Sequence, residues 1–218
     1  MNFPEKFKLY LKNHPITSFI LLINLVMALI VLIDGNFSIL TLVKYGALNP
    51  LLITQFHEYY RLITVMFLHG SILHFAMNSL ALYYLGGQME IILGPKKYTL
   101  LYFVSGIGSS LLVVLFGVEN QITVGASGAI FGIMGGMLML TFTRTRWFNE
   151  RAIRSIRQMV IINLGITFLI PNISVAGHIG GLTTGIILFY FITPKIPYFL
   201  EKQKLQYEQQ QNQKDQFN

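Results

Sequence analysis

Five stretches of this chain contain no Asp, Glu, Lys or Arg over 21 residues or more. They cover residues 13–33, 62–89, 98–118, 120–143 and 158–194. A membrane-spanning α-helix needs about 20 mostly apolar residues, so each of the first four stretches has room for one helix. The fifth has 37 residues and is divided by Pro171-Asn172, which favours two helices. The pattern predicts an all-α polytopic membrane protein with six transmembrane helices.

The composition agrees with this fold class. Hydrophobic residues make up 53% of the chain and charged residues only 11%, whereas a soluble domain carries about 25% charged residues. These values argue against a soluble enzyme and against a disordered protein. Because the chain has no Cys, it has no disulfide, thiolate nucleophile or Cys-ligated metal site.

The positive charges indicate the orientation of the chain. Lys and Arg accumulate in cytoplasmic loops of membrane proteins. One side of the predicted membrane domain carries only Lys44 and Arg61. The other side carries the remaining fourteen: Lys6, Lys8, Lys12, Lys96, Lys97, Arg144, Arg146, Arg151, Arg154, Arg157, Lys195, Lys202, Lys204 and Lys214. This asymmetry predicts that both termini are cytoplasmic, and it assigns the net charge of +7 to topology and to anionic lipid, not to a nucleic-acid partner.

The predicted organisation has three parts. Residues 1–15 form a cytoplasmic N-terminus, 16–194 a six-helix membrane domain, and 195–218 a Gln-rich, disordered cytoplasmic tail. An outer loop over about 34–61 is expected to lie at the membrane interface. No small-x-small cleavage pattern follows the first span, which favours an uncleaved anchor. The fifth helix is expected to begin inside the Arg-rich stretch.

Polar residues inside a bilayer are costly and are therefore functional candidates. Ser127 lies in the sequence Gly125-Ala126-Ser127-Gly128, directly before an apolar run. Small neighbours allow a substrate carbonyl to approach closely, and the amides at a helix N-terminus favour negative charge. The alternative is a packing role, since small residues at 128, 132 and 136 would form a helix-contact ridge. Both roles are compatible.

His178 lies on a second small-residue face. Gly181 and Gly185 follow it by three and seven residues, so all three share one side of a helix. If this face packs on the ridge after Ser127, the two side chains would supply a nucleophile and a general base. A packed histidine bonded to the backbone is the alternative.

A third polar cluster contains His69, His74 and Asn78. His74 and Asn78 are separated by four residues and share a helix face, so both could donate hydrogen bonds to one oxyanion. A metal site formed by His69, His74 and His178 is a rival interpretation. It is disfavoured because no carboxylate is available to orient the ligands and because a spacing of five separates His69 from His74 on one helix.

Together these clusters resemble the rhomboid family of intramembrane serine proteases. The resemblance runs from about residue 45 to residue 192. It rests on the segments listed here: Tyr60-Arg61, His69 with His74 and Asn78, Tyr84-Leu85-Gly86, Glu90 and Gly94, Gly125-Ala126-Ser127-Gly128, and Ala176-Gly177-His178 with Gly181 and Gly185. Gly-x-Ser-Gly alone is a weak signal, but the full set in this order is specific. Tyr60 replaces the family's Trp, and Phe131 replaces a common Tyr.

The resemblance implies a role for each matching residue. Ser127 would be the nucleophile and His178 the general base of a dyad, without a metal or another cofactor. His74, Asn78 and the amide of Ser127 would form the oxyanion hole. The remaining matching residues would support the site: His69 at the start of the second helix, Gly125 and Gly128 around the serine, Phe131 against the histidine, and Arg61 and Glu90 holding the outer loop to the core.

The implied activity is endoproteolysis of single-span membrane proteins near the outer membrane face. The chain resembles the basic six-helix form, without a seventh helix or large soluble domain, and a bacterial plasma membrane is the expected location. Oligomeric state is not predicted. A catalytically inactive relative that binds or escorts membrane proteins is the first alternative, although such a protein is expected to have lost Ser127 or His178. A transporter is the second, disfavoured because the spans contain no acid.

Overall fold

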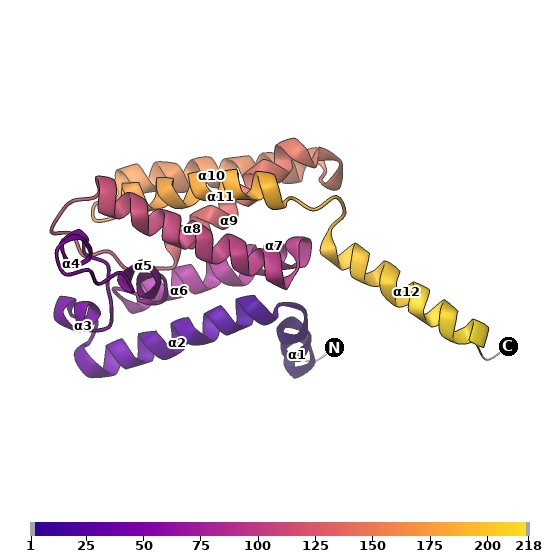
Figure 1. The fold of residues 1–218 in the computed structure, drawn as a ribbon, viewed down its shortest axis with the longest axis horizontal. Helices are drawn as coiled ribbons and strands as arrows, with labels where there is room; N and C mark the ends of the chain where they lie inside the picture. The colour runs from indigo at the N-terminus through magenta and orange to yellow at the C-terminus, as the bar shows by residue number, and fades with distance from the viewer. Residues whose placement is uncertain (1–2, 217–218) are drawn as a thin grey trace.

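The computed structural model describes residues 3–216, which form a bundle of α-helices (Figure 1). Residues 1–2 and 217–218, the ends of the predicted N-terminus and tail, lie outside the described residues. Among the described residues, four helices are long and apolar enough to cross a membrane. They are α2 (Pro15–Gly35), α8 (Pro95–Phe116), α10 (Glu150–Leu169) and α11 (Val175–Ile192). As predicted, α10 begins inside the Arg-rich stretch.

The second charge-free stretch is a bent segment and not one straight helix. Its first part contains α5 (Arg61–Thr64) and the 3-10 turn η1 (Val65–Phe67). After a 92° bend, the chain continues through residues 72–93 as α6 (Ile72–Ala81), the π-helical turn η2 (Leu82–Gly86) and α7 (Gly87–Leu93). Together with the shorter α9 (Ser127–Thr143), the helices follow the six predicted spans in order.

The centre of the bundle is α9, where 12 of 17 residues are buried. It packs against α8 and α11, and glycines make the contact with α11 very close. A Cβ atom at Gly181 would overlap the carbonyl oxygen of Gly128, and one at Gly185 would overlap that of Gly132. The predicted glycine faces of the fourth and sixth spans therefore do pack on each other.

The outer loop contains two short helices, α3 (Ile39–Lys44) and α4 (Pro50–Thr54). Arg61 connects this loop to the bundle, and its side chain is only 4% exposed. Its Nη1 atom donates to the carbonyl oxygens of Val43 and Ala47, both at 2.8 Å, and its Nε atom donates to Glu58 at 2.5 Å. These bonds join Arg61, the first residue of α5, to both ends of the loop segment between residues 43 and 58.

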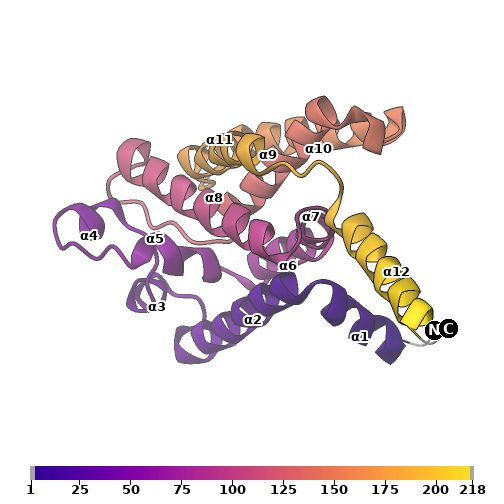
Figure 2. The ribbon, with the colours of Figure 1, turned by 45° about the vertical axis from the view of Figure 1, so that its right-hand side comes forward.

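The two ends of the described chain lie at one end of the bundle, opposite α3 and α4 (Figure 1). They belong to α1 (Phe3–Asn13) and α12 (Tyr198–Gln216). The prediction of a disordered tail is wrong for α12, which projects away from the bundle (Figures 1 and 2). Its many Gln, Lys and Glu residues make it polar, but these residues are also good helix formers.

Glu90 does not hold the outer loop, and that expectation is wrong. Its carboxylate accepts hydrogen bonds from the backbone amides of Ile16 and Thr17, both at 2.9 Å, and from the Thr17 hydroxyl at 2.8 Å. His14, the residue before α2, makes no capping bond with its side chain. Glu90 therefore caps the N-terminus of α2 from α7, where the helix dipole favours a negative charge.

Replacing Glu90 by Gln is expected to lower the free energy of unfolding by about 1–3 kcal/mol. Gln keeps the size of the side chain but loses the charge and one of the two acceptor oxygens at a buried site. Thermal unfolding of the detergent-purified variant measures the effect. Glu119→Gln, at an exposed position, is the matched control. An unchanged unfolding temperature for Glu90→Gln would show that the cap does not stabilise the bundle.

Candidate active site

The chain reaches Ser127 by an extended segment that returns from the end of α8 toward the centre of the bundle (Figure 2). Thr123 in this segment pairs with Leu48 of the outer loop through two backbone hydrogen bonds of 2.9 and 3.0 Å. The Gly125 amide donates to the carbonyl oxygen of Val65 at 3.0 Å. The outer loop and the bent segment therefore fix the point at which α9 begins.

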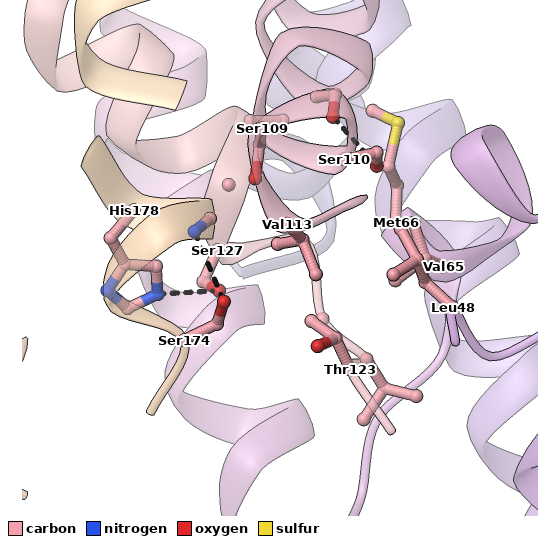
Figure 3. Close-up of a pocket in the computed structure, with 16 residues that line it drawn as sticks. Leu48, Val65, Met66, Ser109, Ser110, Val113, Thr123, Ser127, Ser174 and His178 are labelled. Atoms are coloured by element: carbon pink, nitrogen blue, oxygen red, sulfur yellow. Dashed lines mark hydrogen bonds between the residues drawn. The ribbon is translucent and has the colours of Figure 1, made fainter. Parts of the chain in front are cut away.

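Ser127 is the first residue of α9, and its side chain faces His178 of α11 (Figure 3). The Oγ atom of Ser127 lies 2.9 Å from Nε2 of His178. The close contact between α9 and α11 brings these two residues together across 51 positions of sequence. Both side chains are half-buried, which leaves an approach to the hydroxyl.

The ring of Phe131 lies flat against His178. The ring centroids are 4.0 Å apart and the planes differ by 18°. Phe131 is one turn after Ser127 on α9, so the helix that carries the serine also holds the plane of the imidazole. The aromatic contact expected at this position is present without the hydroxyl of a tyrosine.

Gly125 lies between the side chains of Ser127 and His74, and the space above Gly125 is defined here as the position that a Cβ atom on this residue would occupy. Gly125 has φ +132°, a backbone conformation that glycine adopts readily. A Cβ atom there would lie 2.9 Å from Nε2 of His74 and 3.4 Å from Oγ of Ser127. The absence of a side chain at Gly125 thus leaves a small space between the hydroxyl and the imidazole of α6.

His74 and Asn78 share one face of α6, and Asn78 is 6% exposed. The Gly70 amide donates to Nδ1 of His74 over a long 3.5 Å, which favours the tautomer with its proton on Nε2, facing the space above Gly125. The Asn78 amide donates one hydrogen to the carbonyl oxygen of His74 at 3.2 Å, and its second hydrogen remains for another acceptor.

His69 is 1% exposed and packs edge-on against the rings of His74 and Phe75, with centroids 5.2 and 5.6 Å away. It therefore lies next to the start of α6 and not in contact with His178. Within residues 3–216, no group of three His, Asp or Glu side chains is placed to hold a metal ion.

A small cavity of about 20 Å³ lies behind Ser127 (Figure 3). That volume is enough for roughly one water molecule. Ser109 of α8 and Ser174, the residue before α11, are among the polar residues that line it. Ser174 also caps α11 by accepting a hydrogen bond from the Gly177 amide at 3.1 Å, a role that its position before the helix could have revealed.

One direct partner of His178 was not predicted from the sequence. Thr167 of α10 places its hydroxyl 2.8 Å from Nδ1 of His178, and Thr167 is 2% exposed. The contact joins residues on either side of the Pro171-Asn172 turn. No motif marks this threonine, because hydroxyl residues in membrane helices often bond only to their own backbone.

A hydroxyl hydrogen-bonded to an imidazole at a helix N-terminus is the arrangement expected of a nucleophilic serine. Comparisons with known proteins show the family of the chain. A family model described as the rhomboid domain matches residues 57–195. The chain belongs to the rhomboid family.

Three relatives illustrate the similarity. RHOMBOID-like protein 1 of Arabidopsis thaliana is 37% identical over 169 residues, which cover 76% of this chain and 43% of that protein. Rhomboid protease GluP of Bacillus subtilis (strain 168) is 38% identical over 167 residues, covering 77% of this chain and 32% of GluP. Putative rhomboid protease YdcA of the same bacterium is 27% identical over 196 residues, covering 88% of this chain and 95% of YdcA. The chain therefore spans less than half the length of the first two relatives.

Proposed function

We propose that this rhomboid protein is an intramembrane serine endopeptidase in which Ser127 is the nucleophile and His178 the general base. The 2.9 Å contact between Ser127 Oγ and His178 Nε2 is the observation that carries the proposal. Similarity to Rhomboid protease GluP supports it. The roles of the other site residues are proposed from their positions relative to Ser127 and His178.

In the proposed reaction, Ser127 Oγ attacks the carbonyl carbon of a substrate peptide bond while its proton moves to His178 Nε2. The tetrahedral intermediate then collapses: the C–N bond breaks, and His178 gives the proton to the leaving nitrogen. A water molecule attacks the resulting ester, again through His178, and releases the acid and the free serine. Two residues acting in this way divide one difficult step into two easier ones.

The negative oxygen of the intermediate would lie in the space above Gly125. His74 Nε2, the free amide hydrogen of Asn78 and the backbone amide of Ser127 are the proposed donors. Preorganised donors of this kind are often the largest contribution to catalysis of acyl transfer. Gly125 keeps the serine accessible, Gly128 lets α8 and α11 pack closely beside it, and His69 and Phe131 support the rings of His74 and His178.

The proposed substrates are single-span membrane proteins, cut near their outer ends. Peptide hydrolysis needs water, so the site would have to open toward the outer aqueous side. A substrate helix would also have to unwind, which favours small or helix-breaking residues at the cut. The distribution of Lys and Arg supports cytoplasmic termini over residues 1–15 and 195–218, with 16–194 in the membrane, and we place the protein in a bacterial plasma membrane.

The test uses the purified protein in liposomes with a single-span reporter that carries small and helix-breaking residues near one membrane face. Wild-type protein is expected to cut the reporter at that face, and Ser127→Ala is expected to bind it without cutting. Cleavage that persists in Ser127→Ala would overturn the proposal. Binding without cleavage by both proteins would favour the inactive, escorting relative.

A further inference from the structure

Nδ1 of His178, the ring nitrogen that does not face Ser127, makes a contact that the proposed reaction does not use. Nδ1 of His178 lies 2.8 Å from Oγ1 of Thr167 on α10. Only two residues of α10 are buried, and Thr167 is one of them. The one well-buried hydroxyl on this otherwise exposed helix is thus directed at the imidazole.

The direction of the hydrogen bond follows from the second contact of the threonine. A hydroxyl has one hydrogen to donate, and Thr167 Oγ1 donates it to the carbonyl oxygen of Asn163 at 2.8 Å. The oxygen must then accept a hydrogen from Nδ1 of His178. A neutral imidazole with its proton on Nδ1 has a lone pair on Nε2, the atom that faces Ser127.

Phe131 cannot provide this selection. Stacking at 4.0 Å fixes the plane of the His178 ring, but the ring could turn over within that plane and still be stacked. It could also carry its proton on either nitrogen. A hydrogen bond to one ring nitrogen selects between the two ring orientations and between the two tautomers. It sets which nitrogen carries the proton and in which direction that nitrogen points.

We propose that Thr167 is a positioning residue that keeps the proton of neutral His178 on Nδ1 and directs Nε2 at Ser127. It takes the place that a carboxylate occupies in a serine triad, but as a neutral acceptor. The catalytic consequence of this proposal rests on the proposed function, whereas the tautomer of His178 does not.

The first test is the ¹⁵N spectrum of histidine-labelled protein in detergent, near neutral pH. The chain has five histidines, and the signals of His178 are identified by their loss in His178→Ala. We expect Nδ1 to be protonated in the wild type and in Thr167→Ser, and the proton to move toward Nε2 in Thr167→Val. Thr183→Val removes a similar hydroxyl that bonds to the Ile179 carbonyl of α11 and is expected to leave the spectrum unchanged.

The second test is the rate at which a fluorophosphonate labels Ser127. Thr167→Val is expected to slow labelling about tenfold, the effect of one lost hydrogen bond, in a protein that thermal unfolding shows to be folded. Thr167→Ser is expected to restore most of the rate. Protonation of Nε2 in the wild type, or the same tautomer in the wild type and Thr167→Val, would overturn the inference. Protonated Nδ1 in a wild-type protein that is not labelled would support the inference and overturn the proposed function.

Discussion

His178→Ala is expected to lower the rate of substrate cleavage by about 10⁴-fold or more, to the level of Ser127→Ala. The effect is large because the serine hydroxyl is a weak nucleophile unless a base removes its proton. The distance of 2.9 Å between the two side chains makes His178 the group that can do so. The described contacts of His178 include no Asp or Glu, so no carboxylate is bonded to the ring to support the base.

Residues that act as one unit are not additive. The double variant of Ser127 and His178 should therefore be no slower than either single variant. Initial rates of reporter cleavage in liposomes measure this comparison. His57→Asn serves as a control, because His57 is exposed in the outer loop and Asn tolerates its positive φ of 58°. If the double variant were much slower than both single variants, Ser127 and His178 would not act together in one catalytic step.

Gly181→Val is expected to abolish cleavage and to destabilise the protein. A Cβ atom at Gly181 meets the carbonyl oxygen of Gly128, which is backbone and cannot rotate away. The contact can be relieved only if α9 and α11 move apart. Overpacking of this kind costs about 1–3 kcal/mol or more, and a shift of about 1 Å between reacting groups costs about 10²-fold in rate.

Gly165→Ala is the matched control for this prediction. No other group lies within 4 Å of a Cβ at Gly165, so the substitution should raise helix stability by up to about 1 kcal/mol and leave cleavage unchanged. Thermal unfolding and reporter cleavage are measured for both variants. A Gly181→Val variant with the unfolding temperature and cleavage rate of the wild type would contradict the close packing of α9 on α11.

The charge-free stretches predicted the helices well where each predicted span is one straight helix. The fifth stretch was expected to hold two helices divided by Pro171-Asn172, and α10 and α11 end and begin on either side of that turn. The second span was less predictable, because its 92° bend lies within an apolar run. There the Ser71 side chain accepts from the His74 amide and starts a new helix, a local signal that a count of charges does not detect.

The site was predictable where one helix carries the pattern. Glycine spacing indicated the faces of α9 and α11, and a spacing of four placed His74 and Asn78 together. Contacts between distant segments left no such pattern. The bond of Thr167 to His178 and the cap that Glu90 supplies to α2 depend on helix packing, which sequence periodicity does not specify.

The most direct test of the account is active-site labelling of detergent-purified protein with a fluorophosphonate probe, followed by identification of the labelled residue. Wild-type protein is compared with Ser127→Ala and His178→Ala, each shown to be folded by thermal unfolding. We predict that the probe modifies Ser127 in the wild type and does not label either variant. Absence of labelling in folded wild-type protein, or labelling that survives in His178→Ala, would contradict an activated serine at this site.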